Sequence, residues 1–257
     1  MSRKVAIANQ KGGVAKTTSA QAIGAALADL GDSVLLVDLD PQACLTFCAG
    51  LDPDSCEPSI HDVILGRVQA PEAIVALKSS TADLDILPAN IDLAGAEVVL
   101  SGKTGREFAL ARGLEPVEDE YDWIIIDCPP SLGILTICGL TAAHEVVIPI
   151  QCETLSYRGV GQLLETVDEV RRFTNPELEV RGVIATMFDS RTNLGREVLE
   201  EVSRIYGLEL IGPPVRKSVR FAEAPAAGKT IFEYAPTIPG ALSYVEIATA
   251  LRKGVAA

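Results

Sequence analysis

The sequence predicts an α/β protein, a single domain built on a mostly parallel, twisted sheet with helices on both faces. Short continuous apolar runs alternate along the chain with longer segments of helical periodicity, which is the pattern of strand–helix–strand units. Aromatic residues make up only 5% of a chain that is 48% hydrophobic, so aliphatic side chains must form most of the core. Such a composition suits buried parallel strands, and 257 residues fit one domain of this class.

The first forty residues predict one complete strand–helix–strand unit. Residues 4–8 form a short β-rich run, and a glycine-rich turn follows at residues 12–13. Residues 17–30 are rich in alanine and end at Gly31, which predicts a helix. Residues 34–38 (VLLVD) form a continuous apolar run of the buried-strand type.

The same alternation continues to the end of the chain. Further strands are predicted at 84–87, 123–127, 145–149, 182–187 and 208–211. Helices are predicted between them, most clearly at 159–173, 194–206 and 240–253. The turn-rich segment 50–60 is predicted to be a surface loop. Because no linker or internal repeat divides the chain, we predict one domain.

Charge and composition exclude several classes of protein. The net charge is −13, and 22% of residues are charged, a globular composition that excludes wholesale disorder and argues against a polybasic nucleic-acid coat. The six cysteines are scattered, and no secretory signal precedes the first strand, so we expect reduced thiols. No apolar run reaches the roughly 18 residues of a membrane span. A soluble, cytoplasmic protein is therefore expected.

Residues 9–18 (NQKGGVAKTT) lie between the first predicted strand and helix, a place where phosphate groups bind. Backbone N–H groups of such a loop point inward, and Lys16 can reach the terminal phosphates of a nucleotide. The Thr17 hydroxyl is available to Mg²⁺. The usual G-x-x-x-x-G-K-[ST] pattern is not met, because Gln10 and Ala15 stand at its glycine positions. The segment instead reads K-G-G-x-x-K-T, with an additional lysine at Lys11.

This loop resembles the deviant Walker A motif, K-G-G-x-x-K-[ST], of the ParA/MinD/NifH class of P-loop ATPases. Other segments resemble ParA partition ATPases of the Soj type, in the same order: VLLVDLDPQ at 34–42, DILPANIDLAGAE at 85–97, YDWIIIDCPPSLG at 121–133, VVIPIQCE at 146–153, TMFDSRTNLG at 186–195 and VRFAEAPAAGKTI at 219–231. The resemblance covers almost the whole chain. It implies the P-loop fold and the short form of the family, one ParA-type ATPase domain over 1–257 without an N-terminal helix-turn-helix extension.

The resemblance also implies a site for ATP with Mg²⁺. Lys16 would bind the β- and γ-phosphates, and Lys11 would reach across an ATP-dependent homodimer to the partner's nucleotide, like an arginine finger. Met187 and Pro214 would lie on the adenine side. The loop residues implied to hold the nucleotide are Gly12, Gly13, Val14, Ala15, Lys16, Thr17 and Thr18.

Aspartates follow two apolar runs at positions where parallel sheets bind ligands. Asp127 is at the Walker B position, where an acidic group holds Mg²⁺ directly or through water. By resemblance, Asp40 positions the attacking water and Asp38 organises the Mg²⁺ shell; the alternative is that they cap the turn at Pro41. Glu153 resembles a family acid near the nucleotide, with a structural or a functional role. The implied catalytic residues are Lys11, Lys16 and Asp40, and the implied metal ligands are Thr17, Asp38 and Asp127.

A local cluster of basic residues stands out in this acidic chain, comprising Arg191, Arg196, Arg216, Lys217, Arg220 and Lys229. Family members use arginines in the D-x-R-T-N-L-G and V-R-x-x-E-A-P segments to bind DNA without sequence preference, and Arg191 and Arg220 match those positions. Contacts of this kind release counterions, so that binding is sensitive to salt. The alternative is a face whose cations are solvated or paired with glutamates. The expected DNA-binding residues are Arg191, Arg220, Arg216 and Lys217.

The sequence departs from the family pattern near both sites. Ala15 replaces the usual glycine before Lys16, a change that is tolerable if the φ angle is negative. Residues 43–45 (ACL) stand where Gly-Asn-Ala is usual, and residues 216–218 (RKS) replace Pro-Arg-Asn. These departures leave the cargo of the ATPase open.

The sequence thus predicts a slow, Mg²⁺-dependent ATPase that dimerises with ATP and binds double-stranded DNA non-specifically. By resemblance, it would partition chromosomes or plasmids with a ParB-like centromere-binding partner, in the cytoplasm and on the nucleoid. The alternatives are a ParA-like ATPase that positions a protein cargo, a MinD-like membrane ATPase, a NifH-like iron–sulfur reductase and a DNA-binding scaffold without hydrolysis.

Sequence features disfavour three of these alternatives. The tail has only Arg252 and Lys253 as basic residues, too few for a basic membrane-binding face. No second cysteine motif accompanies Cys128, as a shared iron–sulfur cluster would need. An active enzyme is favoured over an inert scaffold by the presence of Lys11, Lys16, Asp40 and Asp127.

Overall fold

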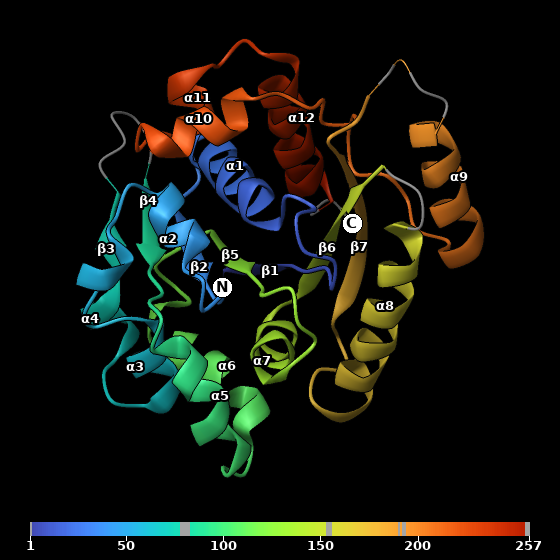
Figure 1. Cartoon of the computed structure of the whole chain (residues 1–257). Coiled ribbons are helices and arrows are strands. Elements are labelled where there is room, and N and C mark those ends of the chain that lie inside the picture. The colour runs from blue at the N-terminus through green and yellow to red at the C-terminus, as the bar shows by residue number, and fades with distance from the viewer. Residues whose placement is uncertain (1, 78–82, 153–155, 190, 192–193, 255–257) are drawn as a thin grey trace.

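A seven-stranded sheet runs through the middle of the molecule (Figure 1). The computed structural model describes residues 2–77, 83–152, 156–189, 191 and 194–254. The strands lie in the order β3-β4-β2-β5-β1-β6-β7, with β3 antiparallel to β4 and the other neighbours parallel. Their bounds are β1 (Arg3–Ile7), β2 (Val34–Asp38), β3 (Val75–Ala76), β4 (Leu84–Leu87), β5 (Trp123–Asp127), β6 (Glu145–Gln151) and β7 (Glu179–Thr186). The mostly parallel sheet is confirmed.

Helices cover both faces of the sheet (Figure 1). One face carries α1 (Lys16–Asp29), α10 (Arg220–Ala226), α11 (Ile231–Tyr234) and α12 (Pro239–Lys253). The other carries α3 (Ile60–Leu65), α5 (Leu93–Ser101), α6 (Ala109–Leu114), α7 (Ile134–Ala142) and α8 (Ser156–Phe173). Peripheral helices are α2 (Cys44–Cys48), α4 (Ala70–Ala73) and α9 (Leu194–Tyr206). Within the described residues, no helix is both long and apolar enough to cross a membrane.

The central strands are buried on both faces, which explains why they are continuous apolar runs in the sequence. Along β5, Ile124 and Ile126 belong to the core on one face, and Trp123 and Ile125 belong to the core on the other. Successive side chains of a strand point to opposite faces, so a strand between two helical layers needs apolar residues at every position.

Helix α1 is held between the sheet and α12. A Cβ atom on Gly24 would lie only 2.5 Å from Cδ2 of Leu36, so this glycine allows the helix to approach the sheet closely. On the outer side, the hydroxyls of Ser19 and Tyr244 share a hydrogen bond of 2.9 Å. The C-terminal helix α12 therefore braces the helix that follows the glycine-rich loop.

The predicted strand at 208–211 is wrong. Leu210 forms only an isolated bridge to Val183, through two backbone hydrogen bonds of 2.9 and 2.8 Å. Gly207 and Gly212 flank this segment, and both have a φ of +67°. These left-handed residues turn the chain toward the edge of β7 and away again, so that a regular ladder cannot extend.

Candidate nucleotide-binding site

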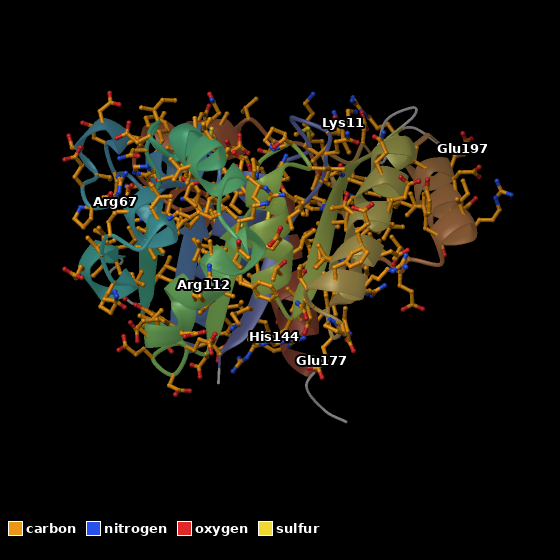
Figure 2. The ribbon with its side chains drawn as sticks, turned by 90° about the horizontal axis from the view of Figure 1, so that it is seen from below. Lys11, Arg67, Arg112, His144, Glu177 and Glu197 are labelled. Carbon is orange, nitrogen blue, oxygen red and sulfur yellow. The ribbon has the colours of Figure 1, made fainter. Side chains whose placement is uncertain are left out.

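The loops that carry the predicted site residues meet at one edge of the sheet, where β1, β2 and β5 end. Ile7 is in register with Asp127, and Asp127 is in register with Asp38. The three strands therefore end level with one another, at the carboxyl edge where α/β sheets bind ligands. Lys11 lies at this end of the molecule, and His144 lies toward the opposite end (Figure 2).

The glycine-rich loop is anchored to the neighbouring strand β6. The Asn9 side chain is buried; its Nδ2 donates to the Pro149 carbonyl at 2.7 Å, and its Oδ1 accepts from the Lys11 backbone N–H at 3.0 Å. The Lys11 ammonium donates to Oε1 of Gln151 at 3.5 Å. Lys11 is thus placed at the mouth of the loop by β6.

Lys16 presents a buried ammonium to the loop. Its Nζ donates to the Lys11 carbonyl at 3.4 Å, and the residue is 7% exposed. Burial lowers the pKa of Lys16 from its usual value, an effect that the nearby carboxylates of Asp127 and Asp40 partly offset. Among the described residues it has no salt-bridge partner within 4.0 Å. A polyphosphate in the loop would supply the missing negative charge.

Asp127 is a buried carboxylate without a hydrogen-bond partner of normal geometry among the described residues. Burial raises its pKa well above the usual value, and the charge of Asp38 raises it further. Thr17 and Lys16 act in the opposite direction, because a hydroxyl donor and a positive charge favour the ionised form. Buried carboxylate oxygens without partners are hard ligands that suit Mg²⁺. Asp127 and the Thr17 hydroxyl fit that ion.

Asp38 differs because protein groups bind both of its oxygens. Oδ2 accepts from the Thr46 amide at 2.8 Å and from the Thr46 hydroxyl at 2.7 Å, and Oδ1 accepts from the Asp40 amide at 3.2 Å. Burial raises the pKa of Asp38 to about 6, although the Thr46 hydrogen bonds lower it. The Thr46 hydroxyl also accepts from the Ala89 amide at 2.9 Å. Through Thr46, Asp38 connects α2 and Ala89, just after β4, to the site. The role of Asp38 toward Mg²⁺ stays a prediction.

Asp40 lies at the half-buried mouth of the same crevice. Its Oδ1 accepts from the Gln42 amide at 2.9 Å, which caps the turn that follows β2. The structural alternative for Asp40 is therefore present in the molecule. It leaves Oδ2 available to a water molecule, so the catalytic prediction is compatible with the cap.

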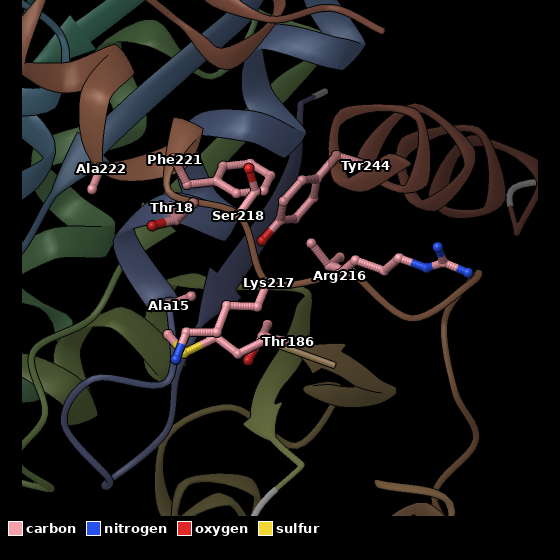
Figure 3. Close-up of a pocket in the computed structure, with 11 residues that line it drawn as sticks. Ala15, Thr18, Thr186, Arg216, Lys217, Ser218, Phe221, Ala222 and Tyr244 are labelled. Atoms are coloured by element: carbon pink, nitrogen blue, oxygen red, sulfur yellow. The ribbon is translucent and has the colours of Figure 1, made fainter. Parts of the chain in front are cut away.

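A cavity of about 300 Å³ adjoins the start of α1 (Figure 3). Its lining includes Met187, whereas Pro214 lies one residue before the lining residue Val215, and the adenine-side role of both stays a prediction. Arg216 and Lys217, expected to bind DNA, also line it. Lys217 extends toward Ala15, whereas Arg216 points away (Figure 3). The full lining is Ala15, Thr18, Thr186, Met187, Val215, Arg216, Lys217, Ser218, Phe221, Ala222 and Tyr244.

Three polar residues that shape the site were not predicted from the sequence. Asn9 holds the loop, Thr46 holds Asp38, and the Thr186 hydroxyl donates to the carbonyls of Val14 and Ile150 at 3.0 Å each. Only Asn9 carried a local signal, because it lies inside the loop motif. Thr46 and Thr186 become recognisable only when the strands that carry their partners are placed side by side.

The condition under which an alanine before Lys16 would be tolerable, a negative φ, is not met. Ala15 has a φ of +64°, and Ala43, which opens the segment where the family has Gly-Asn-Ala, has a φ of +50°. An L-residue in the left-handed region is strained because its Cβ approaches the following carbonyl oxygen. Both positions therefore have backbone conformations that suit glycine, and the alanines store strain beside the phosphate loop and Asp40.

We expect Ala15→Gly to stabilise the protein. Relief of left-handed strain is worth about 1–2 kcal/mol, and the added freedom of glycine in the unfolded chain removes about 0.5–1 kcal/mol of this gain. The free energy of unfolding in urea should rise by about 0.5–1 kcal/mol. As a control, Ala94→Gly in the exposed part of α5 should lower it by a similar amount. A loss of stability for Ala15→Gly would contradict the strain.

The remaining predicted residues fall into three groups. Arg191 and Arg220 are exposed and form salt bridges to Asp189 and Glu223. The predicted Glu153 and the side chain of Arg196 lie outside the described residues. The cysteines are free, and Cys128 is buried beside Asp127. In the described ranges, no group of three or more His, Cys, Asp or Glu side chains is arranged to hold a metal ion.

Comparisons with known proteins agree with this arrangement. A family model described as an AAA domain matches residues 2–180. The chain is 45% identical to the sporulation initiation inhibitor protein Soj of Bacillus subtilis, over 96% of this chain and 97% of that protein. It is 39% identical to the chromosome partitioning protein ParA of Caulobacter vibrioides, over 96% of this chain and 92% of that protein.

A solved structure matches equally well. The crystal structure of cobyrinic acid a,c-diamide synthase from Mycobacterium smegmatis, with bound ATP analogue and magnesium, is 48% identical and has a TM-score of 0.88. The match covers 98% of this chain and 95% of that chain, so the predicted P-loop fold is confirmed. Sequence identity over nearly full lengths, the family model and the fold all agree: the chain belongs to the ParA/MinD family of deviant Walker A ATPases, in its ParA/Soj branch.

Proposed function

We propose that the protein binds ATP with Mg²⁺ and hydrolyses it slowly. The observation that carries this proposal is the pair of buried charges at the loop, the Lys16 ammonium and the Asp127 carboxylate, which have no salt-bridge partners among the described residues. Bound Mg²⁺ would neutralise charge on the phosphates, held by Asp127 and Thr17. Lys16 would bind the terminal phosphates, and Asp40 would orient the attacking water.

The same proposal includes an ATP-dependent homodimer. Three large apolar side chains are exposed on segments that follow β2 and β4: Phe47 is 56% exposed, Ile91 is 62% exposed and Val98 is 75% exposed. Exposed apolar side chains of this size are typical of interaction surfaces where they gather. Across such a dimer, Lys11 would contribute its charge to the partner's nucleotide, as the family resemblance implies.

The finer proposal is that the dimer binds double-stranded DNA non-specifically and partitions a chromosome or plasmid with a ParB-like partner, in the cytoplasm and on the nucleoid. Arg191 and Arg220 support it, because both are exposed and both match DNA-binding positions of the family. Arg216 and Lys217 would contribute from the cavity rim. A dimer doubles this surface, so two weak half-sites act together and ATP controls the affinity.

Asp40→Ala is expected to trap the dimer. Loss of the water-orienting carboxylate should stop hydrolysis and leave the phosphate contacts of Lys16 in place. In size-exclusion chromatography, the variant should elute as a dimer with ATP and as a monomer with ADP. The double variant Lys11→Ala, Asp40→Ala should stay monomeric while still binding nucleotide. A monomer under both conditions for Asp40→Ala alone would contradict the sandwich dimer.

The trapped dimer also tests DNA binding. In a fluorescence anisotropy titration with a duplex of arbitrary sequence, it should bind with ATP and lose affinity steeply with added salt. Adding Arg220→Glu should abolish binding without affecting dimerisation. If the trapped dimer does not bind DNA at low salt, the nucleoid proposal fails. The protein-cargo alternative should then be tested with candidate cargo proteins, and the membrane alternative with anionic liposomes.

A second candidate function comes from the name of the Mycobacterium smegmatis relative, which is 48% identical. That name describes a synthase that forms the a,c-diamide of cobyrinic acid. Incubation with cobyrinic acid, Mg-ATP and glutamine or ammonia, followed by mass spectrometry, would test it. An amide product would favour this second candidate over partition.

A further inference from the structure

The two arginines that match the family's DNA-binding positions, Arg191 and Arg220, are each paired with a carboxylate of their own chain. On α10, Nη1 of Arg220 donates to Oε2 of Glu223 at 2.7 Å. The two residues lie one helical turn apart, and their side chains are 52% and 42% exposed. The Tyr234 hydroxyl, from α11, donates to the same Oε2 at 3.2 Å. Glu223 is therefore held against Arg220 by a third group.

The second arginine shows the same arrangement on an unrelated segment. Nε and Nη2 of Arg191 donate to Oδ1 and Oδ2 of Asp189, at 2.9 and 2.6 Å. This two-point contact uses one edge of the planar guanidinium, where its N–H donors lie, and a phosphate binds through the same kind of edge. The other described members of the cluster, Arg216, Lys217 and Lys229, make no salt bridge within the described residues.

We propose that Glu223 and Asp189 are internal competitors of DNA phosphates, which weaken DNA binding and reduce its dependence on salt. The inference rests on the proposed DNA-binding function. Each carboxylate occupies donors that a phosphate would use, so phosphate must displace it. An exposed pair of this kind is weak, so displacement is possible. The displaced carboxylate stays on the same or a neighbouring turn, however, and its negative charge continues to oppose the phosphate.

An alternative role for Glu223 predicts the opposite result. If Glu223 served only to orient Arg220 for DNA, removal of its charge would release the arginine and weaken binding. If Glu223 competes, removal of its charge strengthens binding. Glu223→Gln separates these roles, because the amide oxygen can still accept the Tyr234 hydrogen bond while the negative charge is lost.

The experiment compares DNA affinity of the full chain with Mg-ATP, in wild type and Glu223→Gln, over a series of NaCl concentrations. We expect Glu223→Gln to bind a random-sequence duplex about 2- to 30-fold more tightly, because two pairs are released in a dimer. The slope of log K against log salt should also steepen, by up to about 0.9 for each arginine that gains full contact with a phosphate. A merely structural role would not steepen this slope.

Two control variants make the result specific. Glu177→Gln removes the same charge at the end of the molecule opposite Lys11 (Figure 2), and should change affinity much less. Tyr234→Phe removes the hydroxyl but keeps the Glu223 charge, and should not tighten binding. One outcome would overturn this inference alone: the wild type binds DNA, Arg220→Glu does not, and Glu223→Gln binds no more tightly than the wild type. No DNA binding by any variant would overturn the inference together with the proposed function.

Discussion

Replacement of Lys16 by alanine is expected to abolish nucleotide binding. Among the described residues, the buried ammonium has only the Lys11 carbonyl as a hydrogen-bond acceptor, at 3.4 Å, so its charge is available to phosphates. Loss of two charge-assisted hydrogen bonds predicts an affinity loss of at least about 100-fold. Titration of the wild type and of Lys16→Ala with a fluorescent ATP analogue measures this loss of affinity directly.

The matched control for Lys16→Ala is Lys103→Ala, which removes an exposed lysine that contacts the Leu65 carbonyl at 3.4 Å. This variant should bind ATP like the wild type. Lys16→Ala should also melt at the same or a higher temperature without nucleotide, because it removes a desolvated charge. Tight ATP binding by a folded Lys16→Ala protein would refute the assignment of the loop.

Asp127→Asn is expected to stabilise the nucleotide-free protein and to remove the effect of Mg²⁺ on ATP binding. The pKa of Asp127 is raised in the folded protein, so between its usual value of 3.8 and the raised value the folded state binds more protons than the unfolded state. Stability therefore falls as pH rises through this range. Each tenfold difference in proton affinity corresponds to about 1.4 kcal/mol, and each kcal/mol moves the melting temperature by about 2–4 °C.

Thermal melts at two pH values test this prediction. At pH 8 the melting temperature of Asp127→Asn should be several degrees above that of the wild type. At pH 5 the difference should be smaller, because the Asp127 carboxylate destabilises the wild type less at that pH. In ATP titrations, wild type should bind more tightly with Mg²⁺ than with EDTA, and the variant should bind equally in both. Asp52→Asn, in the exposed loop before α3, is a control that should change neither property. A lower melting temperature for Asp127→Asn than for the wild type at pH 8 would contradict a destabilising effect of the buried Asp127 carboxylate.

The central sheet could be predicted because its strands are buried on both faces, which makes a run such as 34–38 apolar at every position. The loop and Asp127 could be located for a related reason, since parallel strands present their ends to one ligand crevice. The segment 208–211 was predicted wrongly because its composition suits a strand. Whether this segment forms a regular hydrogen-bonded ladder with β7 depends on the direction of the chain at Gly207 and Gly212.

Other parts of the site depend on geometry that the sequence does not encode locally. Alanine alone does not reveal the sign of φ, so the left-handed conformation of Ala15 emerged only from the folded loop. The hydrogen bonds of Asp38 to Thr46 join residues eight positions apart that meet only when α2 packs beside β2. Lys217 was expected on a DNA surface, yet it also lines the cavity beside Ala15, because 215–218 runs along β7 toward α1.

The hydrogen bond between α1 and α12 can form only late in synthesis on the ribosome. Ser19 and its hydrogen-bond partner Tyr244 are 225 residues apart. At about 5–20 residues per second, translation leaves the helix behind the phosphate loop without this partner for roughly 11–45 s. Tyr244 also lines the cavity next to the loop, so the nascent chain has no finished pocket during this interval. Any binding of ATP that depends on this cavity is therefore expected only after the last helix has docked.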